Sequence, residues 1–187
     1  EWVVVVEKRQ IRNARRVLQK ISGLKNLKVV AGGASRAESV WNGLSAVSNA
    51  SDWVLIHDAA RPLVSKKIVM RILEAAQKTG AAICGLPSSA TVKRVDIKKG
   101  FIKRTEDRNT LFLAQTPQVF RKDLLLKRYL KLRGRVFKLT DEAALFDGTC
   151  VRVKMVLGDP RNIKVTVPED LEWLQYLRGI IVLYQKI

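Results

Sequence analysis

The feature that most constrains the fold is an alternation of short apolar runs with segments of helical period. The β-branched run Trp2–Val6 predicts a buried strand, and residues 9–21 repeat their apolar side chains at helical spacing. Leu27–Ala31 predicts a second strand, and residues 36–47 a second helix. The pattern continues with a strand at 53–57, a helix at 66–78 and a strand at 81–86. Because parallel strands need crossover connections, this alternation predicts an α/β fold with a mostly parallel sheet covered by helices.

The alternation loosens between Pro87 and Phe112. Two strand-like pieces, 91–95 and 100–104, lie there among polar residues, which predicts a β-arm; an unstructured surface loop is the alternative. Beyond it the sequence predicts helices at 122–132, 141–146 and 168–178 and a strand at 151–157. We therefore predict a single domain over residues 1–187, with residues 87–112 as its arm.

Composition places the chain among globular proteins and raises the question of nucleic-acid binding. Of 187 residues, 47% are hydrophobic and 28% charged, and the apolar runs are too short to cross a bilayer. Thirty-five basic residues against seventeen acidic ones give a formal charge of +18. The basic residues are spread along the chain, and aromatic residues do not interleave with them as in a stacking surface. A solvated basic face with a phosphate pocket is favoured over nucleic-acid binding, and no membrane partner is expected.

The two cysteines, Cys84 and Cys150, lie in apolar runs, which predicts buried, reduced thiols. No basic segment followed by a long apolar core, as in a secretory signal, is visible at the start. We therefore expect a cytoplasmic protein of bacterial type. A plastid location stays open, because a transit peptide would precede Glu1.

The glycine-rich turn with which nucleotide-binding α/β domains usually open is missing from the sequence. The pair Gly32-Gly33 follows a predicted strand, but it lacks the spacing of a dinucleotide-binding or P-loop fingerprint. The sequence also starts abruptly within a predicted strand. We expect that a segment precedes Glu1, so that the domain 1–187 is N-terminally incomplete.

The string IHDAARP, residues 56–62, places an aspartate just after a predicted strand. Ligands of open α/β sheets bind at this edge, and a carboxylate there can hold a divalent cation together with triphosphate oxygens. Arg61, three residues after Asp58, offers a planar fork of donors for phosphate. An exposed Asp–Arg pair on a tight loop is the alternative. His57, the only histidine, is predicted to be packed rather than catalytic.

Three further strings carry groups suited to a nucleotide or a phosphate. GGASRAES offers the backbone of Gly33 and the hydroxyl of Ser39, DRNTLFLAQTPQVF offers Arg108 and Thr116, and LTDEAALF offers Thr140. Each also has a structural interpretation. GGASRAES could be a strand-to-helix connection with a serine N-cap, and Thr140 could be an ordinary N-cap.

The fifth string, GDPRNIKVTVPEDL, carries Lys164 between apolar neighbours in what the pattern predicts as a short strand. A lysine at a sheet edge that guards against aggregation is the structural alternative. The following Pro168, with acidic residues after it, is typical of a helix start.

Taken together and in this order, the five strings resemble one family, the 2-C-methyl-D-erythritol 4-phosphate cytidylyltransferases of the non-mevalonate isoprenoid pathway. The likeness runs from about Val29 to Leu171. It implies a Rossmann-like three-layer α/β sandwich of the nucleotide-diphospho-sugar transferase type with a protruding β-arm. It also implies transfer of CMP from CTP to methylerythritol phosphate with Mg²⁺, by in-line positioning and charge neutralisation.

The resemblance further assigns roles at the nucleotide. Asp58 would hold the metal, Gly33 and Ser39 would contact the cytosine, and Ala59 would lie beside the ribose. Family members dimerise through the arm, so residues 87–112 are expected to form a homodimer element.

The same resemblance assigns five residues to the sugar phosphate, with Lys164 and Arg108 also acting in catalysis. These residues are Arg61, Arg108, Thr116, Thr140 and Lys164.

Some positions depart from the family pattern. Ala34 and Ala90 stand where the family usually has polar or acidic residues, which puts one contact near the cytosine and one contact in the arm in doubt. The family's glycine-rich loop would precede Glu1, so a molecule beginning there is expected to bind CTP weakly and turn over little. Three alternatives remain open: a ribitol 5-phosphate cytidylyltransferase, a non-catalytic homologue, and a basic nucleic-acid-binding protein.

Overall fold

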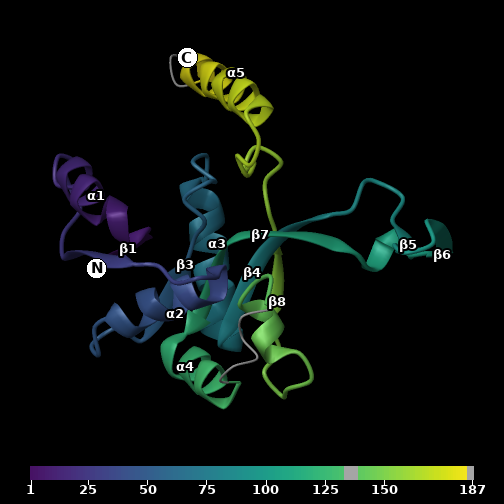
Figure 1. Cartoon of the computed structure of the whole chain (residues 1–187), viewed down its shortest axis with the longest axis horizontal. Helices are drawn as coiled ribbons and strands as arrows, with labels where there is room; N and C mark the ends of the chain where they lie inside the picture. The colour runs from purple at the N-terminus through teal and green to yellow at the C-terminus, as the bar shows by residue number, and fades with distance from the viewer. Residues whose placement is uncertain (133–138, 185–187) are drawn as a thin grey trace. The chain divides into compact units, whose positions relative to one another are not determined.

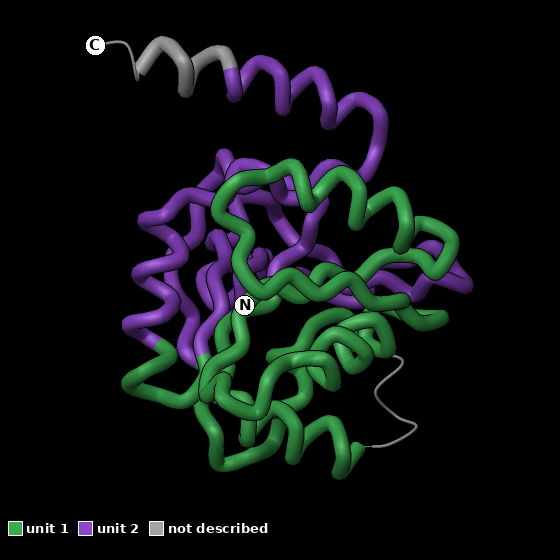
Figure 2. Tube along the Cα trace, turned by 90° about the vertical axis from the view of Figure 1, so that its left-hand side faces the viewer, with its two compact units in different colours: residues 1–56, 76–81, 119–153 green, residues 57–75, 82–118, 154–187 purple. Residues whose placement is uncertain are grey.

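The computed structural model describes residues 1–132 and 139–184. The chain is divided into two compact units, each assembled from three stretches of sequence (Figure 2). Unit 1 comprises Glu1–Ile56, Ala76–Ala81 and Val119–Val153, and unit 2 comprises His57–Ala75, Ala82–Gln118 and Lys154–Ile187.

Unit 1 begins with the predicted alternation (Figure 1). Strands β1 (Trp2–Val6) and β2 (Leu27–Ala31) pair in parallel, as predicted, in a two-stranded sheet. The helical segment between them starts as the 3-10 helix η1 (Lys8–Gln10) and continues as α1 (Ile11–Leu18). Helix α2 (Arg36–Ala46) follows β2 and packs closely on β1, because a Cβ added at Gly43 would lie 2.8 Å from a Val5 methyl carbon.

The rest of unit 1 contains β3 (Trp53–Ile56), α4 (Lys122–Lys131) and the 3-10 helix η4 (Ala143–Phe146). Stacked rings of Phe120 and Phe146, 5.5 Å apart, lie in its core. The prediction of an α-helix at 141–146 with Thr140 as its cap was wrong. The turn is 3-10, and the carboxylate of Asp141 accepts the hydrogen bond from the Ala144 amide at 3.1 Å.

A four-stranded sheet has the strand order β3-β7-β4-β8. Strands β4 (Ala81–Pro87) and β8 (Lys154–Leu157) pair in parallel, and helix α3 (Lys66–Thr79) precedes β4. Strand β8 is shorter than predicted, and Cys150 before it is exposed. Its predicted burial was wrong, because the residue follows a turn at Gly148 (φ 68°) and lies outside the strand, whereas Cys84 in β4 is buried as predicted.

Strand β7 (Phe112–Arg121) was not predicted from the sequence. Its inner half is buried although it carries Gln115, Thr116 and Gln118, which interrupt any apolar or alternating pattern. Because of these polar side chains, the sequence pattern did not indicate this ten-residue strand.

Residues between β4 and β7 form the predicted arm. Strands β5 (Lys93–Asp96) and β6 (Phe101–Thr105) make an antiparallel hairpin, with an irregularity between Arg94 and Val95 (Figure 1). Gly100, at φ 73°, lies in its turn. The helix predicted at 168–178 is α5 (Glu169–Tyr184), which is also part of unit 2.

Candidate active site

The predicted Asp58–Arg61 motif forms a tight turn in unit 2. The amide of Arg61 donates to the carbonyl oxygen of Asp58 at 2.9 Å, which closes the turn. The amide of Asp58 donates to the hydroxyl oxygen of Thr116 in β7 at 3.0 Å. The turn is therefore held by its own backbone and by a strand residue 58 positions later.

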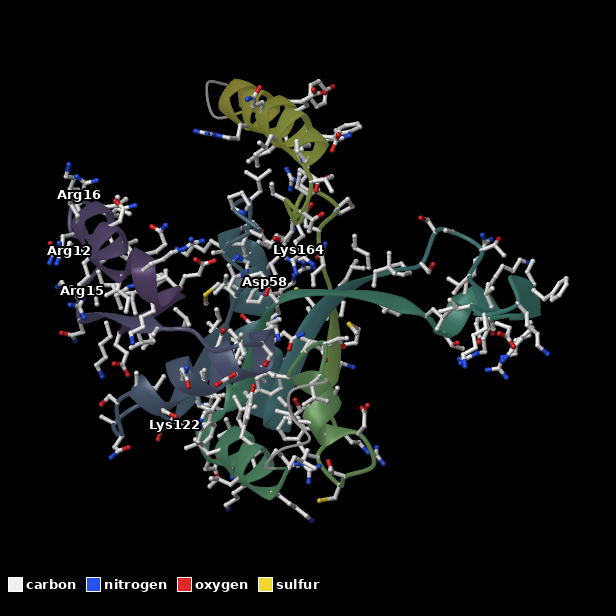
Figure 3. All side chains as sticks on the ribbon, in the orientation of Figure 1. Arg12, Arg15, Arg16, Asp58, Lys122 and Lys164 are labelled. Atoms are coloured by element: carbon white, nitrogen blue, oxygen red, sulfur yellow. The ribbon has the colours of Figure 1, made fainter. Side chains whose placement is uncertain are left out.

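Two cations meet the Asp58 carboxylate. The Lys164 ammonium lies 3.4 Å and the Arg61 Nε atom 3.7 Å from the same oxygen, Oδ2. Asp58 and Lys164 are labelled in Figure 3. The Asp58 and Arg61 side chains are 17% and 11% exposed, whereas Lys164 is 43% exposed and can move toward solvent. Two positive groups around one carboxylate leave a net positive cluster, which suits a phosphate or another polyanion.

Lys164 reaches this cluster from a segment without regular structure. The prediction of a short strand around it was wrong, and with it the structural alternative of a sheet-edge lysine. The amide of the next residue, Val165, donates to the carbonyl of Ala60 at 2.8 Å. The segment is thus hydrogen-bonded to the aspartate turn instead of to a neighbouring strand. This hydrogen bond places Lys164 beside Asp58.

Arg61 is fixed on its other side by Asn162. Its guanidinium NH1 group donates to the Asn162 carbonyl at 2.8 Å. The Asn162 side chain is fully buried, and its amide nitrogen donates to the Thr116 carbonyl at 2.8 Å. Gln115 bonds the carbonyls of Asp159 and Asn162 at 3.1 and 3.3 Å. These amides attach the NIKVT segment to β7.

His57 and Thr116 complete the support of the turn. The Thr116 hydroxyl oxygen lies 3.0 Å from His57 Nδ1, and His57 Nε2 lies 2.9 Å from the Arg61 carbonyl oxygen. Thr116 is only 4% exposed. The sequence prediction of a packed His57 agrees with these contacts, and a direct contact of Thr116 with substrate stays a prediction.

Arg108 lies in the 3-10 helix η2 (Arg108–Thr110), within the arm, where its side chain is exposed. Its NH1 group is 3.5 Å from the Ser89 carbonyl, and the Asp107 side chain caps the turn by accepting from the Asn109 amide. Its described contact is therefore with the arm and not with the cluster around Asp58.

Gly33 and Ser39 come together in unit 1. The amide of Gly33 donates to the Ser39 hydroxyl at 3.1 Å, and that hydroxyl donates to the Ser35 carbonyl at 2.9 Å. Ser35 is the N-cap of α2, accepting from the Glu38 amide at 3.1 Å, as the structural interpretation of this string predicted. A ligand would have to replace the Gly33–Ser39 bond in order to use either group.

Thr140 is exposed in unit 1, two residues before a buried carboxylate. Glu142 is 1% exposed on its side chain and receives the Arg36 NH1 group at 2.8 and 3.0 Å and the Tyr129 hydroxyl at 3.2 Å. Burial raises the pKa of Glu142, and the Arg36 guanidinium partly opposes that rise. This pair joins the GGASRAES and LTDEAALF strings within unit 1.

Comparison with known proteins decides the family. The family model described as 2-C-methyl-D-erythritol 4-phosphate cytidylyltransferase matches residues 1–178. The chain belongs to this family. A cytidylyltransferase of this name from Caldanaerobacter subterraneus subsp. tengcongensis is 44% identical over 155 residues, which cover 83% of this chain and 68% of the relative. Another, from Alkaliphilus metalliredigens, is 40% identical over 172 residues, covering 91% of this chain and 71% of the relative.

Solved structures agree. The structure described as 4-diphosphocytidyl-2C-methyl-D-erythritol synthase from Anaerococcus prevotii is 33% identical and matches with a TM-score of 0.85. The match covers 94% of this chain and 78% of that one. The predicted α/β fold class, the family and the enzyme class of nucleotidyltransferase are thereby confirmed.

In this cytidylyltransferase the carboxylate at the candidate site fits a metal that is held mainly by phosphate oxygens of a substrate. Among the residues that the structure describes, no three His, Cys, Asp or Glu side chains come together as a metal cage. Asp58 supplies one carboxylate, and Mg²⁺ is commonly held by one or two carboxylates with phosphate oxygens and water around the rest of its shell. The residues present are compatible with that mode. In the described part of the chain no helix is long and apolar enough to cross a membrane.

The sequence interpretation of this cytidylyltransferase missed Gln115 and gave Asn162 no role. Both lie inside the strings that carry the resemblance, but nothing local marks them as buried. Their burial depends on each other, because the Gln115 amide bonds the Asn162 carbonyl 47 residues away. A side-chain amide in each of two of the strings, DRNTLFLAQTPQVF and GDPRNIKVTVPEDL, was the available signal.

Proposed function

We propose that this chain transfers CMP from CTP to 2-C-methyl-D-erythritol 4-phosphate, giving 4-diphosphocytidyl-2-C-methyl-D-erythritol and pyrophosphate, in the non-mevalonate pathway of isoprenoid biosynthesis. The observation that carries the proposal is the cluster of Asp58, Arg61 and Lys164 in a chain of this family. A partly buried turn presents one carboxylate with two cations, an arrangement suited to a polyphosphate and its metal.

The reaction needs no covalent enzyme intermediate. A phosphate oxygen of the sugar phosphate attacks the α-phosphorus of CTP, and the bond from that phosphorus to the bridging oxygen of the β-phosphate breaks. Pyrophosphate leaves with the electron pair. Lys164, whose ammonium is partly exposed, would offset the charge at the reacting phosphate, and Arg61 would hold the turn beside it.

Mg²⁺ is the proposed cofactor, held by Asp58. When bound, it would neutralise triphosphate charge and polarise the reacting phosphorus. The hydrogen bond from the Asp58 amide to the Thr116 hydroxyl oxygen supports this role, because it restrains the backbone that carries the carboxylate.

The other carried-over residues would bind the two substrates. Gly33 and Ser39 would exchange their mutual hydrogen bond for contacts to the cytosine, and Ala59 would lie beside the ribose. Arg108 and Thr140, both exposed, would contact the sugar phosphate. Thr116 would act through the turn that it holds.

We also propose a homodimer formed through the arm at residues 87–112. The hairpin exposes four large apolar side chains, Val95 at 41%, Ile97 at 93%, Phe101 at 71% and Ile102 at 63%. Exposed apolar area of this kind is typical of a surface that is covered in an assembly. Light scattering should give twice the chain mass. A cytoplasmic location is proposed with it.

The function is tested by pyrophosphate release from CTP and Mg²⁺ with methylerythritol phosphate or ribitol 5-phosphate as acceptor. We expect release with the first acceptor and its loss in Asp58→Asn. Preference for ribitol 5-phosphate would replace the substrate, and a folded protein whose melting temperature CTP and Mg²⁺ do not raise would indicate a non-catalytic homologue. A salt-dependent gel shift at micromolar protein would instead favour nucleic acid.

A further inference from the structure

His57 is bonded at both ring nitrogens, and it is the only histidine of the chain. Its Nδ1 atom lies 3.0 Å from the Thr116 hydroxyl oxygen, and its Nε2 atom lies 2.9 Å from the carbonyl oxygen of Arg61. The imidazole therefore connects β7 with the far end of the Asp58–Arg61 turn, inside unit 2.

The chemistry of the partners fixes the direction of each bond. A carbonyl oxygen only accepts, so Nε2 of His57 must carry the hydrogen that bonds to Arg61. In the neutral ring Nδ1 then has a lone pair, and it accepts from the Thr116 hydroxyl. The Thr116 oxygen in turn accepts from the Asp58 amide at 3.0 Å. Each donor and acceptor is used once, in one consistent arrangement.

The bonds form a closed ring around the turn. They run from the Asp58 amide to the Thr116 hydroxyl, from there to the His57 ring, and from the ring to the Arg61 carbonyl. The Arg61 amide closes this circuit of hydrogen bonds by donating to the Asp58 carbonyl at 2.9 Å. Because Thr116 is 4% exposed, water competes little for its hydroxyl.

We propose that His57 is a positioning residue, held in its Nε2-protonated neutral tautomer by Thr116, that fixes the turn carrying Asp58 and Arg61. The ring has no nitrogen left for a substrate phosphate, so His57 acts through the turn. The Thr116 hydroxyl proton is given to His57, so Thr116 offers no proton to a phosphate and is itself a positioning residue. The inference rests on the proposed function for its catalytic consequence, but the tautomer does not depend on it.

The tautomer is tested first, on the protein without substrates. With ¹⁵N-histidine labelling, long-range ¹H–¹⁵N correlation reports one ring system. The spectra are recorded at about pH 9. We expect a single Nε2–H tautomer in the wild type and a tautomer mixture in Thr116→Val. A tautomer mixture or an Nδ1–H ring in the wild type, or an unchanged spectrum in Thr116→Val, would overturn the proposal that Thr116 holds the tautomer.

Thr149→Val is the matched control for that substitution. The Thr149 hydroxyl also donates a hydrogen bond, to the Phe146 carbonyl at 2.7 Å, but Thr149 belongs to unit 1, whereas His57 and Thr116 belong to unit 2. We expect its spectrum to match that of the wild type. If Thr149→Val moves the His57 signals as Thr116→Val does, the change reflects a general loss of packing, and the proposal that Thr116 holds the tautomer is wrong.

The positioning role is tested by the Mg²⁺ concentration that gives half-maximal pyrophosphate release. We expect His57→Ala to raise this concentration about tenfold, about what the loss of a hydrogen bond costs. His57→Asn keeps an acceptor for Thr116 and should raise it less. Melting temperatures measured on the same samples separate folding from positioning. Lower stability with unchanged Mg²⁺ dependence would make His57 merely structural and overturn the role.

The two failures are distinguishable. If the wild type releases no pyrophosphate with either acceptor, the proposed function fails, and the ring spectrum still decides the tautomer. If the wild type is active and the His57 imidazole is a mixture of tautomers, the proposed tautomer is wrong while the proposed function stands.

Discussion

The ammonium of Lys164 lies 3.4 Å from the carboxylate of Asp58. One backbone hydrogen bond, donated by the Val165 amide to the Ala60 carbonyl at 2.8 Å, holds the two segments side by side in unit 2. The pair is partly exposed on the lysine side, so its contribution to stability is small. Its value is expected to lie in the charge that it places beside a reacting phosphate.

Lys164→Ala should therefore reduce turnover far more than stability. We expect kcat to fall about 100-fold or more, as for the loss of a preorganised charge, and the unfolding free energy to change by less than about 1 kcal/mol. Pyrophosphate release and urea unfolding measure the two. Lys154→Ala, another exposed lysine of unit 2, is the control and should change neither. Equal losses in activity and stability would return Lys164 to a structural role.

Asn162→Ala should destabilise the protein by about 2 kcal/mol, because it leaves the buried Thr116 carbonyl without the amide that lies 2.8 Å away. Asn162→Asp should cost at least as much, since it places a carboxylate beside acceptor oxygens. Urea unfolding measures both, with Asn49→Ala as an exposed control. A loss for Asn162→Ala no larger than that of the control would contradict the buried-amide account.

Glu142 should make stability fall as pH rises. Burial raises its pKa above the ordinary value of 4.5, so the folded carboxyl keeps its proton at pH values where the unfolded one has lost it. The stability that this residue contributes is thus fully present below the ordinary value and declines as pH rises through the raised pKa. Glu142→Gln should become progressively more stable relative to the wild type over that range.

The measurement for Glu142 is urea unfolding of both proteins from about pH 4 to about pH 8. Glu74→Gln, at an exposed position of α3, is the control for the chemistry of the substitution. A difference between Glu142→Gln and wild type that is constant across the range, or that shrinks with rising pH, would show that desolvation does not dominate at this site.

Gly158→Ala should destabilise unit 2, because the added Cβ would overlap the side-chain oxygen of Gln115 and lie 3.2 Å from the Gly85 carbonyl. We expect a loss of about 1–3 kcal/mol, typical of overpacking. Adding Gln115→Ala removes the overlapping group, so the double variant should lose less than the sum of the two single losses. Additive losses in urea unfolding would refute the overlap.

Local pattern was sufficient for most regular elements. The predicted strands at Trp2–Val6 and Leu27–Ala31 coincide with β1 and β2, and α2 and α3 differ from their predictions by one residue at one end. Periodicity decides these segments because each buries one face that its own residues supply. Strand β7 was missed, since the burial of Gln115 and Thr116 is made tolerable by partners far along the chain.

The sequence by itself determined the α/β alternation, the arm and the family, because these depend on periodicity and on strings of neighbouring residues. Only the tertiary structure decided which groups of those strings are available to a ligand. Lys164 proved to face Asp58 from an irregular segment, whereas the hydroxyls of Ser39 and Thr116 proved to be engaged within the protein. Hydrogen bonds between residues distant in the chain depend on the packed arrangement, and local sequence does not encode them.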